Sequence, residues 1–293
     1  MHTPHANALL DYDEHGAHRS LAGKWRVVRA LRTHRFETAV LLRKSLSRSL
    51  LLALAGIPGR VGFDNAKSGW LLTRRVPVAR GTLHKASTYL PLLEALGLSV
   101  EPGPYDYTVS EEERRAAREL LKTPRAANGQ SLIILHPGAN WFHKRWAPER
   151  FAGLGDRLAA TGCAQVVITG GPDDVSLAAS IKERMQSPAT VLAGQTTLRQ
   201  LGACLEQAHL VVSNDTGVLH IAAALRRSVL ALYGPTSPAL TGPLGNPQRT
   251  VVLHHPDCCP RIPCYEPDHP PHPGMDSISV DEAYAAASRL LVI

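Results

Sequence analysis

One short stretch between an apolar run and a helical pattern combines residue types that could bind an anion. Asn214, Asp215, Thr216 and Gly217 follow the apolar run, and His220 stands three residues further on. The free N–H groups and the dipole at the start of a helix suit a phosphate, and a threonine hydroxyl adds a donor. The same residues are equally consistent with an ordinary helix cap and a hydrogen-bonded core histidine.

Four further polar residues stand in loops of the same kind, each between an apolar run and a helical pattern. A lysine offers a point charge for a phosphate, and a carboxylate suits the diol of a ribose. Each residue alone could instead be a surface residue, since glycine-rich turns are common wherever the chain turns tightly. These additional candidates are Asn140, Lys144, Asp174 and Thr236.

A regular alternation of apolar runs and helical patterns must position these loops. Parallel strands with helices on both faces give this pattern, which is typical of a doubly wound α/β domain. In such a sheet, ligands bind outside the carboxyl ends of the strands, where the candidate residues stand. Strands are expected at 131–135, 164–171, 189–194, 210–215 and 228–234, and helices at 147–162, 172–185, 196–208, 218–226 and 279–291.

The combined set describes a pocket for a nucleoside diphosphate. It matches neither the dinucleotide fingerprint G-x-G-x-x-G nor the P-loop G-x-x-x-x-G-K-[ST]. No Asp-x-Asp pair stands at the end of an expected strand, and the sequence therefore predicts no metal and no cofactor at this pocket.

Length and composition predict two domains in a chain of 293 residues. Two breaks containing proline and glycine surround a charged helix in 101–131, which places the boundary between 1–127 and 128–293. The first part is also α/β but has fewer strands. The longest apolar run, 50–57, is far shorter than a membrane-spanning helix, and no secretory signal is visible. Five cysteines in no disulfide framework fit a reducing cytosol.

The charge of the chain is concentrated in its first part. Residues 1–123 carry 19 Lys and Arg against 12 Asp and Glu, whereas the remainder carries 13 of each. A solvated basic face explains this pattern, and so does an anionic partner such as nucleic acid, an acidic membrane surface or a phosphorylated substrate.

Several motifs occur in an order that resembles the glycosyltransferase family 9 heptosyltransferases of lipopolysaccharide core assembly, with heptosyltransferase II the most similar type. They are HPGANWFHKRWAPERFAGLGDRL, VVITGGPDD, LAGQTTLRQLGACLEQAHLVVSNDTGVLHIAAAL and ALYGPTSP. The resemblance implies a GT-B fold, in which two Rossmann-like domains face a cleft. It implies that 128–293 binds the donor, ADP-L-glycero-D-manno-heptose, and that the basic first domain binds the anionic inner core on lipid A.

The resemblance also implies roles for individual residues in an inverting, metal-independent transfer. Asp215, Thr216, Gly217 and His220 match the family motif D-[ST]-G-x-x-H around the donor phosphates and sugar. Lys144 matches a lysine that binds the diphosphate. By the same resemblance, Asp174 matches an acidic position that contacts the ribose, and Asn140 and Thr236 complete the donor set.

The first residues depart from the family pattern. The family begins with a strand, a Gly-Asp loop and a helix, and the loop aspartate is the proposed general base. Asp11 and Asp13 are the nearest acidic residues, and we interpret them as surface carboxylates. The catalytic base is therefore unknown, the N-terminal domain is expected to be incomplete, and this chain is expected to turn over poorly or not at all.

The tail offers a possible metal site. Cys258, Cys259, Cys264, His269 and His272 could bind zinc, but the spacing C-C-x4-C is a poor match to C-x2-C. A proline-rich loop with thiols is the preferred interpretation.

Three other functions remain as alternatives. A non-catalytic nucleotide-sugar-binding relative is the first, and a nucleotide-sugar epimerase is the second. A nucleic-acid-binding protein is least supported, because the basic stretch lacks interleaved aromatics. The expected location is the cytoplasm, with contact to the inner face of the inner membrane.

Overall fold

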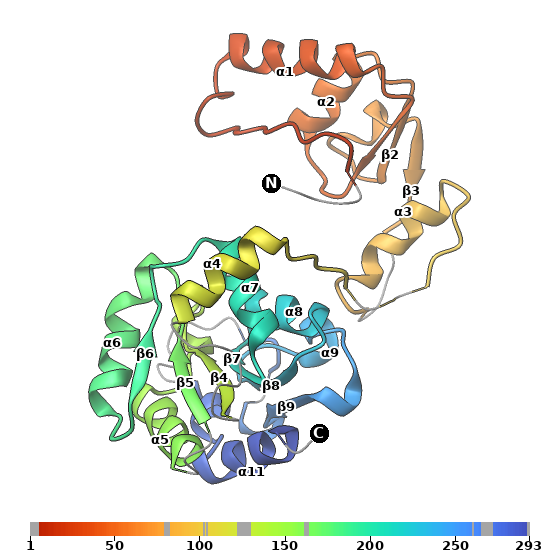
Figure 1. Cartoon of the computed structure of the whole chain (residues 1–293). Helices are drawn as coiled ribbons and strands as arrows, with labels where there is room; N and C mark the ends of the chain where they lie inside the picture. The colour runs from red at the N-terminus through yellow and green to blue at the C-terminus, as the bar shows by residue number, and fades with distance from the viewer. Residues whose placement is uncertain are drawn as a thin grey trace. The chain divides into compact units, whose positions relative to one another are not determined.

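The computed structural model describes residues 6–78, 83–101, 103, 105–121, 130–160, 164–259, 261–264 and 272–291. The chain forms two compact units, residues 1–102 and residues 103–293 (Figure 1).

The first unit contains a parallel sheet with the strand order β1-β2-β3. Its helix α1 begins after Ser20, whose Oγ accepts the N–H of Gly23 at 3.0 Å, and ends at Arg35 in the left-handed region (φ 49). Val28 of α1 is fully buried in a small apolar cluster with Leu51 and other residues. The elements are α1 (Leu21–His34), β1 (Thr38–Leu41), α2 (Leu46–Leu54), β2 (Gly59–Phe63), β3 (Arg74–Val76) and α3 (Leu90–Glu94), with 3-10 turns at Gly69–Leu71 and Ser87–Tyr89.

The second unit contains a six-stranded parallel sheet with the order β6-β5-β4-β7-β8-β9. Counted along this unit, that order is 3-2-1-4-5-6, the order of the Rossmann fold. The strands are β4 (Ser131–His136), β5 (Ala164–Ile168), β6 (Ala189–Val191), β7 (Leu210–Asn214), β8 (Ser228–Tyr233) and β9 (Thr250–His254). The helices are α4 (Glu111–Leu121), α5 (Pro148–Ala159), α6 (Val175–Arg184), α7 (Leu198–Gln207), α8 (Gly217–Ala224), α9 (Pro238–Thr241), α10 (Pro273–Asp276) and α11 (Val280–Leu291).

Apolar side chains cover both faces of this sheet. Along β4, Ile133 and Leu135 belong to one buried cluster, and Leu132 and Ile134 belong to another, because successive side chains of a strand point to opposite faces. Helices α5, α6 and α11 cover the first cluster, and α4, α7 and α8 cover the second (Figure 1). The predicted doubly wound α/β class is confirmed.

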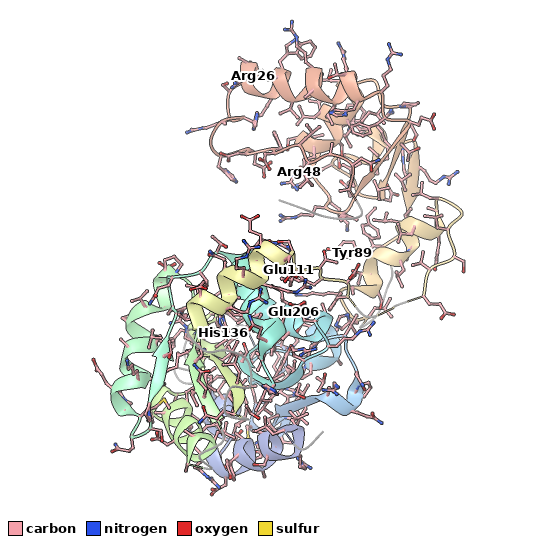
Figure 2. The ribbon with its side chains drawn as sticks, in the orientation of Figure 1. Arg26, Arg48, Tyr89, Glu111, His136 and Glu206 are labelled. Carbon is pink, nitrogen blue, oxygen red and sulfur yellow. The ribbon has the colours of Figure 1, made fainter. Side chains whose placement is uncertain are left out.

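The units divide 25 residues earlier than the sequence predicts, at 102 and 103 instead of 127 and 128. The charged helix α4 belongs to the second unit, because its few apolar residues pack into that core. Ala117 and Leu121 are buried there, and Arg114 of α4 binds Glu206 of α7 with Nε–Oε2 at 2.7 Å. Figure 2 labels Glu111 and Glu206, the two acidic partners of this arginine.

Most expected elements of the second unit are present within a few residues of their predicted limits. Thr197 caps α7 and forms a reciprocal capping box with Gln200. Strands β3 and β9 were not predicted. The expected helical end at Gly162 lies outside the described residues. None of the described helices is both long and apolar enough for a membrane crossing.

Candidate functional site

The polar residues gather where the strand order reverses. Strands β4 and β7 are neighbours in the sheet, and His136 pairs with Ser213 near their carboxyl ends. The helices that follow these two strands lie on opposite faces, which opens a crevice at the strand ends. Loops that follow β4 and β7 therefore meet at the point where this fold binds nucleotides.

Lys144, Asp215 and Thr236 form the centre of the site. The Nζ of Lys144 donates to Oδ2 of Asp215 at 2.7 Å, and the hydroxyl of Thr236 donates to the same oxygen at 2.7 Å. Asp215 is only 7% exposed and Lys144 is 22% exposed. Asp215 comes from the loop after β7, Lys144 from the loop after β4 and Thr236 from the loop after β8. Hydrogen bonds to one carboxylate therefore connect the loops at three strand ends.

The loop that carries Lys144 is fixed on both sides of the lysine. After it, the N–H of Trp146 donates to Oδ1 of Asn214, and Nδ2 of Asn214 donates to the carbonyl of Pro137. The indole N–H of Trp146 donates to the carbonyl of Ile278 at 3.0 Å. Through its two hydrogen bonds, Asn214, the last residue of β7, holds both ends of the loop after β4 and so positions Lys144.

The start of α8 offers backbone donors beside this centre. Thr216 is the N-cap residue without a side-chain cap, and its hydroxyl lies 3.2 Å from the hydroxyl of Ser213. A Cβ added at Gly217 would meet nothing within 4 Å, so this turn of backbone borders open space. His220, one turn further on, is partly buried and packs edge-on against Tyr105, with ring centroids 5.5 Å apart.

Asp174 belongs to a second polar group at the ends of β4 and β5. Its Oδ2 accepts the N–H of Gly171 at 3.0 Å, and its Oδ1 lies 3.3 Å from the guanidinium of Arg145. A Cβ at Gly138 would lie 2.2 Å from Oδ2 of Asp174, so only glycine fits there. Asp174 and Arg145 thus hold the loops after β5 and β4 in place, and both lie at the strand ends that border the site.

His136 lies buried at the end of β4, with Nδ1 3.0 Å from the hydroxyl of Thr169 (Figure 2). Burial lowers the pKa of His136 to about 4, although the negative charge of Asp174 acts in the opposite direction. The imidazole is therefore neutral in the folded protein at neutral pH. Sequence reasoning missed His136, and it missed Arg145; the only signal for either was its place in the predicted loop.

The buried neutral imidazole makes stability depend on pH. An unfolded histidine binds a proton below about pH 6.5, whereas folded His136 does so only near pH 4. The unfolded state therefore binds more protons between these values, and the free energy of unfolding falls as pH falls. We expect His136→Gln to remove roughly 2–3 kcal/mol of this pH dependence, measured by urea unfolding from pH 7 to pH 4. Equal slopes in both proteins would contradict the assignment.

The sequence-predicted residues thus separate into groups. The structure brings Lys144, Asp215 and Thr236 into direct contact, with Thr216 and Gly217 next to Asp215 in the chain. Asn140 is exposed on the β4 loop and His220 lies further along α8. Asp174 contacts Arg145 and Gly171 instead of this centre.

The glycosyltransferase family 9 (heptosyltransferase) model matches residues 24–267. The chain belongs to glycosyltransferase family 9. It is 29% identical over 246 residues to lipopolysaccharide heptosyltransferase 2 of Escherichia coli K12, which covers 76% of this chain and 67% of that protein. It is 30% identical over 260 residues to lipooligosaccharide heptosyltransferase 2 of Haemophilus influenzae, which covers 82% of this chain and 71% of that protein.

A solved structure of a family 9 glycosyltransferase from Veillonella parvula has the same fold, with a TM-score of 0.80 and 26% identity. The similarity covers 94% of this chain and 80% of that one. The predicted family and the predicted fold class are therefore confirmed, and this family 9 member is a glycosyltransferase.

Asp13, an acidic residue near the start of this glycosyltransferase, has a structural role. Asp13 accepts backbone N–H groups of His15, Gly16 and Ala17, which lower the pKa of its carboxyl. A carboxylate with a lowered pKa is a weaker base. Asp11 is exposed. We assign neither residue as the base of the reaction.

The cysteines of the tail lie closer together than their spacing suggests. Ligand atoms of Cys259, Cys264 and His272 all lie within 4.8 Å of one another, and the three residues are buried. Cys258 is exposed, and His269 lies outside the described residues. The structure therefore brings together three of the five residues that the sequence offered as possible ligands, although a proline-rich loop with thiols was the preferred interpretation.

Proposed function

We propose that this glycosyltransferase transfers heptose from ADP-L-glycero-D-manno-heptose to the inner core of lipopolysaccharide, with inversion at the anomeric carbon. The observation that carries the proposal is the contact of Lys144 with Asp215 beside the open start of α8. The heptosyltransferases named above, which share most of the length of this chain, support heptose as the transferred sugar.

In this proposal, Lys144 and the first N–H groups of α8 bind the donor diphosphate, and the Thr216 hydroxyl adds a donor. Asp215 itself would repel a phosphate, so we assign it a positioning role. It holds the Nζ of Lys144 and the hydroxyl of Thr236 at the strand ends. As the bond to the sugar breaks, negative charge moves to the leaving ADP, and fixed positive groups stabilise that charge.

The other predicted donor residues take the outer positions of the proposed site. Asp174 already accepts one N–H and faces Arg145, but a carboxylate has about four lone-pair directions, which leaves acceptors for a ribose diol. Asn140 is exposed on the same rim, and His220 lies one turn along α8; the proposal assigns His220 to the donor sugar. The acceptor hydroxyl must also lose its proton to a general base, which the proposal leaves unassigned.

The direct experiment is transfer of labelled heptose from ADP-heptose to a heptose-bearing lipid A core. We expect slow product formation with ADP-heptose and none with UDP-glucose in parallel. ADP binding without transfer to any inner-core acceptor would support the non-catalytic alternative. Equal transfer from both donors would contradict the proposed specificity.

We expect the donor diphosphate to bind without a metal ion of its own, so that ADP affinity is independent of Mg²⁺. Lys144 and the start of α8 offset the diphosphate charge in place of a metal ion. The measurement is ADP affinity by calorimetry in Mg²⁺-free buffer and with Mg²⁺ added, and the two values should agree. A loss of affinity in EDTA that Mg²⁺ restores would contradict this expectation.

We also propose that the basic first unit binds the anionic acceptor at an acidic membrane surface. Residues 19–85 carry 15 Lys and Arg against Glu37 and Asp64. Arg26 and Arg48 are two of these basic residues (Figure 2). Exposed apolar side chains accompany them, among them Leu21 and Trp25 of α1.

Flotation with lipid vesicles tests the membrane proposal. Vesicles containing phosphatidylglycerol should carry the protein at low salt, and binding should weaken as salt screens the charges. Pure phosphatidylcholine vesicles are the control. Equal binding to both kinds of vesicle would contradict an electrostatic role for the basic residues.

A further inference from the structure

Two cysteines and a histidine converge in the tail of the second unit, outside the proposed donor site. Cys259 is 8% exposed, Cys264 is 4% exposed and His272 is 1% exposed. Their ligand atoms lie within 4.8 Å of one another, and neither cysteine forms a disulfide. Three soft or borderline ligands in a buried cluster are the donor set that zinc prefers.

The distances are close to those of a zinc site. Zinc–sulfur bonds of about 2.3 Å and zinc–nitrogen bonds of about 2.0–2.1 Å place tetrahedral ligand atoms about 3.5–3.8 Å apart. Ligand atoms within 4.8 Å therefore need to approach by about 1.0–1.3 Å at most. Side-chain rotation alone supplies movements of this size.

The local backbone separates the two adjacent cysteines. Cys259 has extended backbone angles (φ -141, ψ 129), in which successive side chains point in opposite directions. Accordingly, Cys259 is buried and Cys258 is exposed. Cys258 is thus a natural control residue, because it shares the chemistry and position of Cys259 but faces away from the cluster.

The cluster is attached to the loop after β8. The N–H of Cys264 donates to the carbonyl of Pro235 at 2.7 Å. A Cβ at Gly234 would lie 2.4 Å from the Met275 side chain, so the tail after His272 packs directly on this loop. Thr236, which follows Pro235 in this loop, donates to Asp215. Order in the cluster is thereby coupled to the Lys144–Asp215 centre.

We propose that Cys259, Cys264 and His272 bind a zinc ion that fixes the tail to the loop after β8. Both thiols lose their protons on binding, so the divalent ion and two thiolates are together neutral, which suits a buried position. Three protein ligands leave one tetrahedral position for water or a further ligand. The ion has a structural role and takes no part in the transfer.

Binding changes the hydrogen bonds of the ligands. The Sγ of Cys259 donates to the carbonyl of Arg261 at 3.3 Å, and this bond is lost with the thiol proton. Nδ1 of His272 accepts the N–H of Gly274 at 3.1 Å. A ring nitrogen that binds zinc leaves the ring proton on the other nitrogen. Zinc therefore either takes the Nδ1 lone pair or places a proton on Nδ1, and in both cases the Gly274 contact must rearrange. The Gly274 amide signal in an NMR spectrum should shift when zinc binds.

The test is the zinc content of the full chain, expressed with added zinc, purified without chelators and analysed by plasma mass spectrometry. We expect one zinc per chain in the wild type and in Cys258→Ser. Cys259→Ser, Cys264→Ser and His272→Gln should lose it. Wild-type protein without zinc, a Cys259–Cys264 disulfide found by mass mapping, or equal loss in Cys258→Ser would overturn the proposal.

A second measurement uses only the wild type and does not depend on variants that fold. Cobalt should replace zinc and give the strong near-ultraviolet absorption of thiolate–cobalt charge transfer. Titration of the thiols with an organomercurial should release zinc. Absence of the charge-transfer band in protein that contains cobalt would overturn the assignment of cysteine ligands.

The coupling to Thr236 has its own readout, and this part rests on the proposed donor site. Removal of zinc should lower ADP affinity several-fold, and Zn²⁺ but not Mg²⁺ should restore it. If zinc is bound and its removal leaves ADP affinity unchanged, the metal site stands and the coupling is wrong. If ADP does not bind at all, the proposed donor site fails, and the zinc content is unaffected.

Discussion

Replacing Lys144 with alanine is expected to weaken ADP binding about 10- to 150-fold. A hydrogen bond to a charged group contributes about 1.5–3 kcal/mol, and 1.4 kcal/mol corresponds to a factor of ten. The substitution also leaves the buried carboxylate of Asp215 facing the diphosphate without its nearest cation. Calorimetry with ADP measures the effect. Lys182→Ala, an exposed lysine in the last turn of α6, is the matched control.

A double substitution separates the direct role of Lys144 from the positioning role of Asp215. If Asp215 acts by holding Lys144, the two residues are coupled and their effects are not additive. Lys144→Ala with Asp215→Ala should then bind ADP no more weakly than Lys144→Ala alone. Equal ADP affinity in the wild type and Lys144→Ala would remove Lys144 from the site. Strictly additive losses would remove the positioning role.

The second unit was predictable because its strands are buried on both faces. Such strands give short, continuous apolar runs, and β4, β7 and β8 are buried along nearly their whole length. Strand β3 has the sequence Arg-Arg-Val with two exposed arginines, so it carries no apolar run. Backbone pairing with β2, which sequence patterns do not reveal, holds it in the sheet.

The boundary of the units was not predictable from the charge of α4. Its sequence, EEERRAARELL, is typical of a solvated linker helix. Its attachment depends on partners far along the chain, including the pair of Arg199 with Glu113 at 2.7 Å. Contacts between residues so far apart in the sequence give no signal in the local hydrophobic periodicity.

The site was predicted as a set of residue types at strand ends but not as a set of contacts. The sequence indicated a cation and an acid, and the structure shows that Lys144 and Asp215 bind each other across 71 positions of the chain. The sequence assigned Asp174 to a ligand, and the structure adds its partners Arg145 and Gly171. These contacts depend on which loops meet in the folded chain. Neither the composition of the sequence nor the spacing of its residues shows which loops meet.

Trp146→Ala is expected to destabilise the second unit by about 3–5 kcal/mol, the usual cost of removing a large buried aromatic side chain. Trp146 is 1% exposed and packs edge-on against Phe151, with ring centroids 5.2 Å apart. The substitution also leaves the carbonyl of Ile278 without its indole donor. For a unit of this size, the loss corresponds to a decrease of about 10 °C in Tm.

Calorimetric unfolding with and without ADP identifies the transition to follow, because a ligand stabilises the unit that binds it. Phe142→Ala is the matched control, since Phe142 is an aromatic residue of the same loop that is 61% exposed. It should change stability by no more than about 0.5 kcal/mol. Trp146→Phe keeps an aromatic ring, although a smaller one, and loses the indole donor; the lost hydrogen bond alone should cost about 1–2 kcal/mol.

The same substitution should also weaken ADP binding, because Trp146 holds the loop that presents Lys144. Its backbone N–H donates to Asn214, and its ring anchors the loop to the segment before α11. Trp146→Ala at a temperature where it remains folded should therefore bind ADP less tightly than Phe142→Ala. A variant that is destabilised but binds ADP like the wild type would show that the hydrogen bonds of Asn214 to the loop are sufficient to position Lys144.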